Sequence, residues 1–292
     1  MSYGQRFKLA LFTDDLTLAA EADHAGVDYI GVDLERLGKT ERQGHLKDAR
    51  ISDHRALQLP RLRASVARAL VFARTNPIHP GSSDEIDRLL DLGAQALLLP
   101  MFTTRVQIDQ FVRWIDGRAR VWLLLETPQA AMRIHAIVQA PGVDLIHVGL
   151  NDLHLGLGLH SHFEVLASDL MTVLSDAIRG AGIEFGVGTL ARCDDRTLPV
   201  PPDLIYPQYP RLKATGAFLS RYFVMRGEGA LDVLREVARC RRRLDEWSLA
   251  GQPAWDAARD RLREHVSQVF HGSPAPSGPE VAKSRAPSSR RV

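Results

Sequence analysis

Eight short hydrophobic runs alternate with stretches of helical periodicity in this 292-residue chain, and that order predicts an α/β fold, the (β/α)8 or TIM barrel. The runs are hydrophobic throughout rather than at alternate positions, which is typical of parallel strands that helices cover. A doubly wound open sheet is the alternative, but the first run, KLALFTDD, leads into no glycine-rich phosphate loop. We therefore expect a closed barrel with extra C-terminal helices.

The predicted strands are regularly distributed along the chain. They cover residues 8–13, 29–35, 69–75, 96–101, 121–127, 145–151, 183–189 and 217–223. Between them, SSDEIDRLLDLG at 82–93 and TTRVQIDQFVRWIDG at 103–117 each start with polar capping residues and stop at glycine, as helices do. Two further amphipathic stretches, 229–247 and 254–270, follow the last strand.

These extra helices exceed what a barrel needs, and such helices often pack on a neighbouring subunit, so we expect a homo-oligomer. We expect one domain over residues 1–271, with C-terminal helices from about residue 228. Residues 272–292 are rich in Pro, Ser and Arg and poor in large apolar side chains, which predicts a disordered tail.

Composition narrows the class of protein. The hydrophobic content of 45% is ample for a core. The formal charge is +2; residues 272–292 contribute +3 (Lys283, Arg285, Arg290 and Arg291 against Glu280), so the rest is about −1, which disfavours a nucleic-acid partner. We interpret Arg241–Arg243 as the solvated face of a helix.

Neither cysteine suggests a disulfide framework or a zinc site, because Cys193 and Cys240 lie in no CxxC or Cys/His pattern. No hydrophobic run reaches membrane-spanning length, and the first residues do not resemble a secretory signal. We expect a cytoplasmic protein with no membrane partner.

Polar residues gather where the predicted strands end, at the rim on which barrels carry their chemistry. In chain order they are Asp33, Glu35, Arg74, Glu126, Asn151 and Asp152. Carboxylates brought together without histidine or thiol partners favour a hard divalent cation such as Mg²⁺ or Mn²⁺. Alternatively, Glu126 caps the next helix and Asp152 pairs with a lysine or arginine. Arg74 pairs with Glu35, holds an oxo acid, or does both.

The fragments VDLE, FARTNP, DLGAQALLLPM, LLLET, GVDLIHVGLNDLHLGLG and AGIEFGVGT, in this order, resemble the HpcH/HpaI aldolase and citrate lyase β-chain family of metal-dependent class II pyruvate aldolases. The resemblance covers roughly residues 8–224, and its most specific part is ET followed later by G-x-x-D-L. It implies a (β/α)8 barrel and an oligomer, a trimer or hexamer, in which C-terminal helices are exchanged.

The resemblance also implies roles for individual residues. Glu126 and Asp152 fall on the ligands of a divalent ion, Mg²⁺ or Mn²⁺ with Co²⁺ as a further option. Arg74 falls on the arginine that contacts the oxo or enolate oxygen, and Glu35 on the acid that steadies it. The backbone around Asn151 and Asp152 matches the loop that receives the substrate carboxylate. The implied reaction is an aldol cleavage or its reverse, with a metal-coordinated water as one candidate base.

The sequence departs from the family pattern at two positions. Arg36 stands where pyruvate aldolases have an acid/base histidine, and Leu124 replaces a glutamine two places before Glu126. His79 and His154 are the candidate replacement bases, although a lone histidine is more often structural than catalytic. Of the two, His154 is preferred, because it lies two residues beyond Asp152.

The end of the last predicted strand suggests a further substrate contact. Arg221 lies where barrels hold phosphate or carboxylate groups, and it binds an acidic part of the substrate or else pairs with Asp33. Gly186, Gly188, Thr189, Arg192 and Ser220 lie near it in the predicted barrel.

The leading hypothesis is therefore a metal-dependent carbon–carbon lyase that acts on a small hydroxy-oxo acid. One alternative is a lyase for a CoA thioester, as the citrate lyase branch implies. Another is a barrel that binds an oxo acid without turning it over, because the usual histidine and glutamine are missing.

Overall fold

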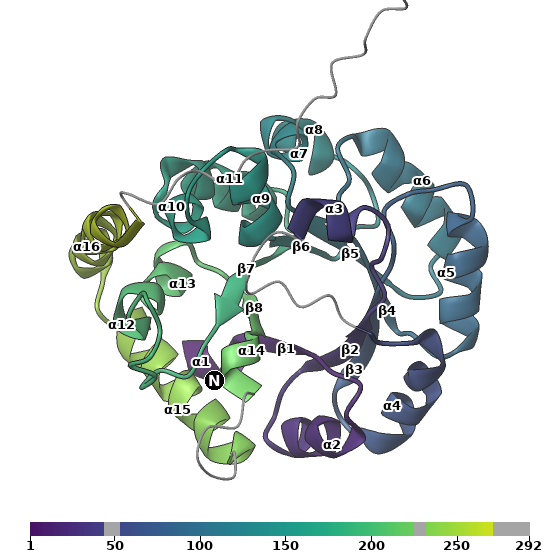
Figure 1. Cartoon of the computed structure of the whole chain (residues 1–292), viewed down its shortest axis with the longest axis horizontal. Helices are drawn as coiled ribbons and strands as arrows, with labels where there is room; N and C mark the ends of the chain where they lie inside the picture. Colours follow the sequence, from purple (N-terminus) through teal and green to yellow (C-terminus); the bar gives the residue numbers. More distant parts are fainter. Residues whose placement is uncertain (44–52, 225–231, 271–292) are drawn as a thin grey trace, which may run out of the picture.

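The computed structural model is a closed barrel of eight parallel strands surrounded by helices, which confirms the predicted fold (Figure 1). It describes residues 1–43, 53–224 and 232–270, and the predicted tail at 272–292 lies outside them. The strands pair in sequence order, and β1 closes the barrel against β8. They are β1 Lys8–Phe12, β2 Tyr29–Asp33, β3 Leu70–Arg74, β4 Ala96–Leu99, β5 Arg120–Leu125, β6 Leu145–Val148, β7 Glu184–Leu190 and β8 Gly216–Leu219.

Most strands end earlier than the hydrophobic runs predict, and the difference matters at β6. The run LIHVGLN leaves the strand after Val148, and α9 (Leu150–Gly156) begins with Gly149 as its N-cap. Asn151 and Asp152 therefore lie on the first turn of a helix and not at a strand end. Similarly, Arg221 starts α14 (Arg221–Val224) and is not part of β8.

The helices that sequence signals marked are present. The two capped stretches form α5 (Ser82–Asp91) and α6 (Arg105–Ile115), and α6 starts with the capping box of Thr104 and Gln107. The other helices that follow strands are α2 Leu16–His24, α3 Lys39–Gln43, α4 Leu59–Ser65, α7 Pro128–Met132, α8 Ile134–Ile137, α10 His162–Ala167, α11 Asp169–Gly180, α12 Pro202–Ile205 and α13 Gln208–Arg211.

The C-terminal helices α15 (Val233–Ser248) and α16 (Gln252–Phe270) pack on their own barrel, α15 against α1 (Tyr3–Arg6) and α16 against α10 and α13. Arg241 of α15 donates to the carbonyls of Gly4 and Phe7 at 2.6 and 2.8 Å. The prediction that Arg241–Arg243 form a solvated face is therefore wrong for Arg241, whose guanidinium joins α15 to the start of the chain. The trimer or hexamer stays a prediction.

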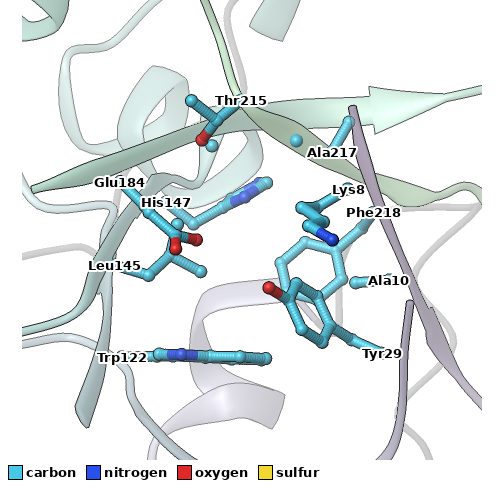
Figure 2. A pocket seen from close by; sticks show the side chains of 12 residues that line it. Lys8, Ala10, Tyr29, Trp122, Leu145, His147, Glu184, Thr215, Ala217 and Phe218 are labelled. Atoms are coloured by element: carbon cyan, nitrogen blue, oxygen red, sulfur yellow. The ribbon is translucent and has the colours of Figure 1, made fainter. Parts of the chain in front are cut away.

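The inside of the barrel is filled by apolar and aromatic side chains, as is usual for this architecture. Phe72, Leu98, Trp122 and Leu124 are among the buried residues of this inner core. A cavity remains at the end where the strands begin, lined by Lys8, Tyr29, Trp122, His147 and Glu184 among others (Figure 2). This cavity lies opposite the strand ends that carry the predicted site. None of the helices in the described ranges is long and apolar enough to cross a membrane.

His147 should make the protein sensitive to acid. Its ring is buried, Nε2 lies 3.0 Å from the Gly188 carbonyl, and burial lowers its pKa to about 3. The unfolded chain binds the proton near the ordinary 6.5, so stability is present above pH 6.5 and is lost as the pH falls towards 3. This loss approaches about 1.4 kcal/mol per pH unit for one group.

We expect the urea concentration at the midpoint of unfolding to fall less for His147→Gln than for the wild type when the pH is lowered from 7.5 to 5.5. His135→Gln, on the exposed side of α8, is the matched control and should leave the drop unchanged. Equal drops in wild type and His147→Gln would contradict the assignment.

Candidate active site

Four acids meet at the end of the barrel where the strands finish, and we call Asp33, Glu35, Glu126 and Asp152 the acid cluster. All four are buried. Asp33 ends β2, Glu126 follows β5 directly and Asp152 lies on the first turn of α9. Three cations accompany them: Arg74 at the end of β3, and Lys39 and Arg42 of α3. In Figure 1, α3 projects over β5 and β6.

Arg74 is fixed by Asp33. Its Nε and Nη2 donate to the two carboxylate oxygens of Asp33 at 2.8 and 2.6 Å, and its guanidinium lies 5.3 Å from the ring centre of Phe12. Burial alone would raise the pKa of Asp33, but Arg74 and then Lys39 outweigh it and hold the pKa far below its ordinary value. Nη1 faces Glu35 Oε2 at 3.4 Å without a hydrogen bond to it. The Nε and Nη2 edge of Arg74 is therefore occupied by Asp33, and Nη1 can still donate to a ligand.

Glu126 is held in an environment that disfavours its charge. It is 3% exposed, and Met101, whose φ of 54° is unusual for a residue with a side chain, donates its backbone N–H to Oε1 at 3.2 Å. Burial first, and then the charges of Asp152 and Glu35, raise the pKa of Glu126 well above its ordinary value. A positive partner is the usual remedy for such a carboxylate.

Asp152 is buried beside this group, and Arg42 reaches it from α3. The Nε of Arg42 lies 3.3 Å from Asp152 Oδ1, and its Nη2 lies 2.5 Å from Glu35 Oε1. Lys39 completes the set, 2.5 Å from Asp33 and 3.5 Å from Glu35. The alternative in which Asp152 pairs with an arginine is therefore realised, although with an arginine that the sequence did not suggest.

Two members of the acid cluster have the chemistry that a hard divalent cation requires. Glu35 Oε2 is buried without a hydrogen bond, and Glu126 carries a raised pKa caused partly by Asp152 and Glu35. Mg²⁺ accepts one or two carboxylates and keeps several waters, so Glu126 and Asp152 suit it. Within the described ranges, no group of three or more His, Cys, Asp or Glu side chains is arranged to hold a metal.

Gly149 makes room for the Glu126 carboxylate. A Cβ at this position would lie 2.9 Å from Glu126 Oε2 and 3.0 Å from its Cβ. We expect Gly149→Ala to displace the carboxylate and weaken Mn²⁺ binding about tenfold or more, since a misplaced ligand typically costs this much. A Mn²⁺ titration followed by electron paramagnetic resonance measures it. Gly180→Ala, where a Cβ meets open space, is the control, and equal affinities in both variants would contradict this role.

The histidines proposed as replacement bases each contact groups outside the acid cluster. The Nδ1 of His154 lies 3.3 Å from the Leu150 carbonyl of its own helix, and its ring lies 5.9 Å from that of His162 on α10. His79 Nε2 pairs with Glu85 at 3.0 Å, and its Nδ1 accepts the Gly81 N–H. These contacts also suit packing and capping roles, and the catalytic role expected for His154 stays a prediction.

The remaining predicted residues are less buried than the four acids of the cluster. Asn151 and Arg221 are exposed, and Arg192 donates to the Tyr222 carbonyl at 3.1 Å. Arg36, in place of the family histidine, points to the His54 carbonyl at 3.0 Å. His54 is nearer the cluster, but its Nδ1 accepts the Asp33 N–H at 3.0 Å, so the neutral ring carries its proton on Nε2.

Sequence reasoning missed Lys39, Arg42 and the Met101 N–H, and it gave Arg74 the wrong principal partner. Lys39 and Arg42 occur in GKTERQG, which is too short to show a helical period. The available signal was that Lys39 and Arg42 are three residues apart, because two residues at this spacing share one face of a helix. Nothing in LLLPM indicates the positive φ of Met101.

Comparisons with known proteins found one matching family model and several solved structures of similar fold. The model of the HpcH/HpaI aldolase/citrate lyase family matches residues 7–192. A comparison with curated proteins found no significant match. Among solved structures, an HpcH/HpaI aldolase/citrate lyase family protein from Burkholderia cenocepacia J2315 has a TM-score of 0.57 at 18% identity, covering 83% of this chain and 95% of that one.

Two further structures are similar in fold. The HpcH/HpaI aldolase from Desulfitobacterium hafniense DCB-2 has a TM-score of 0.54 at 17% identity, covering 74% of this chain and 86% of that one. RipC from Yersinia pestis has a TM-score of 0.54 at 16% identity, with coverage of 80% and 95%. At these identities the likeness concerns the barrel alone.

Proposed function

Since this chain belongs to the HpcH/HpaI aldolase/citrate lyase family, we propose that it is a metal-dependent carbon–carbon lyase that cleaves or forms a small hydroxy-oxo acid through a pyruvate-type enolate. The family is of the lyase and aldolase type and generally depends on a divalent metal. The choice of substrate and the dependence of this chain on a metal are our proposals.

One observation carries the proposal: a guanidinium that is anchored along one edge lies in the same buried cluster as two acids suited to a cation. Arg74 uses Nε and Nη2 on Asp33, and its pKa is raised above the ordinary value because the attraction of Asp33 and Glu35 outweighs burial. Such a group needs no reorganisation when negative charge develops beside it.

The residues divide the work as follows. A divalent ion held by Glu126 and Asp152 would polarise the 2-oxo group of the substrate and lower the energy of the enolate charge. Nη1 of Arg74 would donate to the same developing oxyanion, and Asp33 keeps the fork in place. Lys39 and Arg42 balance the remaining negative charge of the acid cluster, so that an anionic substrate is not repelled.

The test is an assay of pyruvate release from a panel of hydroxy-oxo acids with Mn²⁺, Mg²⁺ or Co²⁺, compared with a sample treated with a chelator. We expect turnover of at least one acid with added metal and none after chelation. If no acid is turned over with any of the three ions while an oxo acid still binds, the barrel is a binding protein and the lyase proposal is wrong.

A further inference from the structure

Arg42 differs from Arg74 in the way it is held. It belongs to the short helix α3 rather than to a strand, and its side chain is 23% exposed, against 13% for Arg74. Its Nε donates to Asp152 at the long distance of 3.3 Å, and its Nη1 donates to the Leu37 carbonyl at 3.4 Å. Only the contact of Nη2 with Glu35, at 2.5 Å, is short. Arg42 is therefore bonded closely to Glu35 and only at a long distance to Asp152.

The guanidinium of Arg42 lies against the same acids that suit a metal ion. Its Nε donates to Asp152 Oδ1 and its Nη2 donates to Glu35 Oε1, so it occupies oxygens of two members of the acid cluster. A guanidinium and a divalent ion that share one carboxylate repel each other and compete for its oxygens.

We propose that the guanidinium of Arg42 neutralises the metal site when no ion is bound, and that a divalent ion must compete with it for Asp152. This inference rests on the proposed function. Arg74 is not the direct competitor for Asp152, because its bidentate bond is made to a different acid, Asp33. The affinity of the site for metal is then set by α3 as well as by the two ligands.

The competition gives a prediction with a definite sign. Removing one positive charge a few ångströms from a divalent ion tightens binding by about tenfold even when screening approaches that of water. We expect the Mn²⁺ dissociation constant of Arg42→Gln to fall about tenfold below that of the wild type, whereas Arg42→Lys, which keeps the charge, stays within about threefold. The measurement is a titration of free Mn²⁺ by electron paramagnetic resonance on the full chain, without substrate.

Arg36→Gln is the matched control, because it removes the same charge three residues before α3. Arg36 points towards Asp53 and the His54 carbonyl and not towards Asp152. The Mn²⁺ dissociation constant of Arg36→Gln should equal that of the wild type within about twofold, because exposed charges are strongly screened. Circular dichroism on each variant checks that the fold is retained.

The outcomes separate this inference from the function on which it rests. If Glu126→Gln loses Mn²⁺ but Arg42→Gln binds it no better than the wild type, the competition is refuted and the metal site stands. Weaker binding in both Arg42→Gln and Arg42→Lys would show that Arg42 positions Asp152 as a ligand, which also overturns competition. If no variant, including Arg42→Gln, binds Mn²⁺, both proposals are wrong.

Discussion

Glu126→Gln will abolish Mn²⁺ binding and lyase activity while it raises the melting temperature of the metal-free protein by a few degrees. The amide keeps an oxygen for the Met101 N–H but removes the anionic ligand. It also removes a carboxylate whose pKa is raised by burial, Asp152 and Glu35. A group with a raised pKa stabilises the fold below its ordinary value of 4.5, and this stability is lost as the pH rises through the folded value.

The gain in melting temperature should therefore be seen at pH 7.5 and shrink towards zero as the pH is lowered to 4.5 or below. Calorimetry of the metal-free proteins across this range measures it. Glu184→Gln makes the same change at the opposite end of the barrel, where Glu184 begins β7 and pairs with Arg120, and should preserve Mn²⁺ binding and turnover. A Glu126→Gln protein that keeps its metal and its activity would refute the ligand assignment.

Arg74→Lys will lower kcat by about 100-fold or more, as the loss of one oxyanion donor does in other enzymes, and will change Mn²⁺ affinity by less than about threefold. An ammonium cannot donate to both oxygens of Asp33 and also present a further donor in a fixed direction, as the guanidinium does. Steady-state kinetics with the best acid of the panel, together with a Mn²⁺ titration, separate the two effects.

Arg118→Lys is the control for this change, since Arg118 pairs with Asp87 at the surface and lies on no strand end. It should leave kcat unchanged. A lysine at position 74 that supports near-normal turnover would mean that Arg74 contributes only charge, and the directional role would have to be given up.

The barrel was predictable because its evidence is repeated eight times. Each strand is a continuous hydrophobic run, and helices α5 and α6 have polar starts of the expected kind. For the run LIHVGLN, only the predicted end of the strand was wrong. The chain changes from strand to helix at Gly149, but the run stays hydrophobic across this point. The positions of Asp33 and Glu126 at strand ends followed from the same runs, whereas the position of Asp152 on α9 did not.

The pairing of charges within the site was not predictable in the same way. Asp33 and Glu35 both follow Val32 within three positions, and only the backbone path decides that Asp33 takes the bidentate bond of Arg74. His154 was chosen for its nearness to Asp152 in sequence, but two residues along a helix point to different sides. Arg241 appeared solvated because three adjacent arginines hide which one faces inward.

The placement of Lys39 and Arg42 on α3, a five-residue segment that adds no strand to the sheet, has an evolutionary consequence. The acids lie at the ends of strands and on α9, whereas these two cations lie on a different segment of the sequence. Under the proposed function, substitutions at Lys39 and Arg42 would change the charge beside the acids while the eight strands keep their packing, so we expect ion preference to diversify through these few residues.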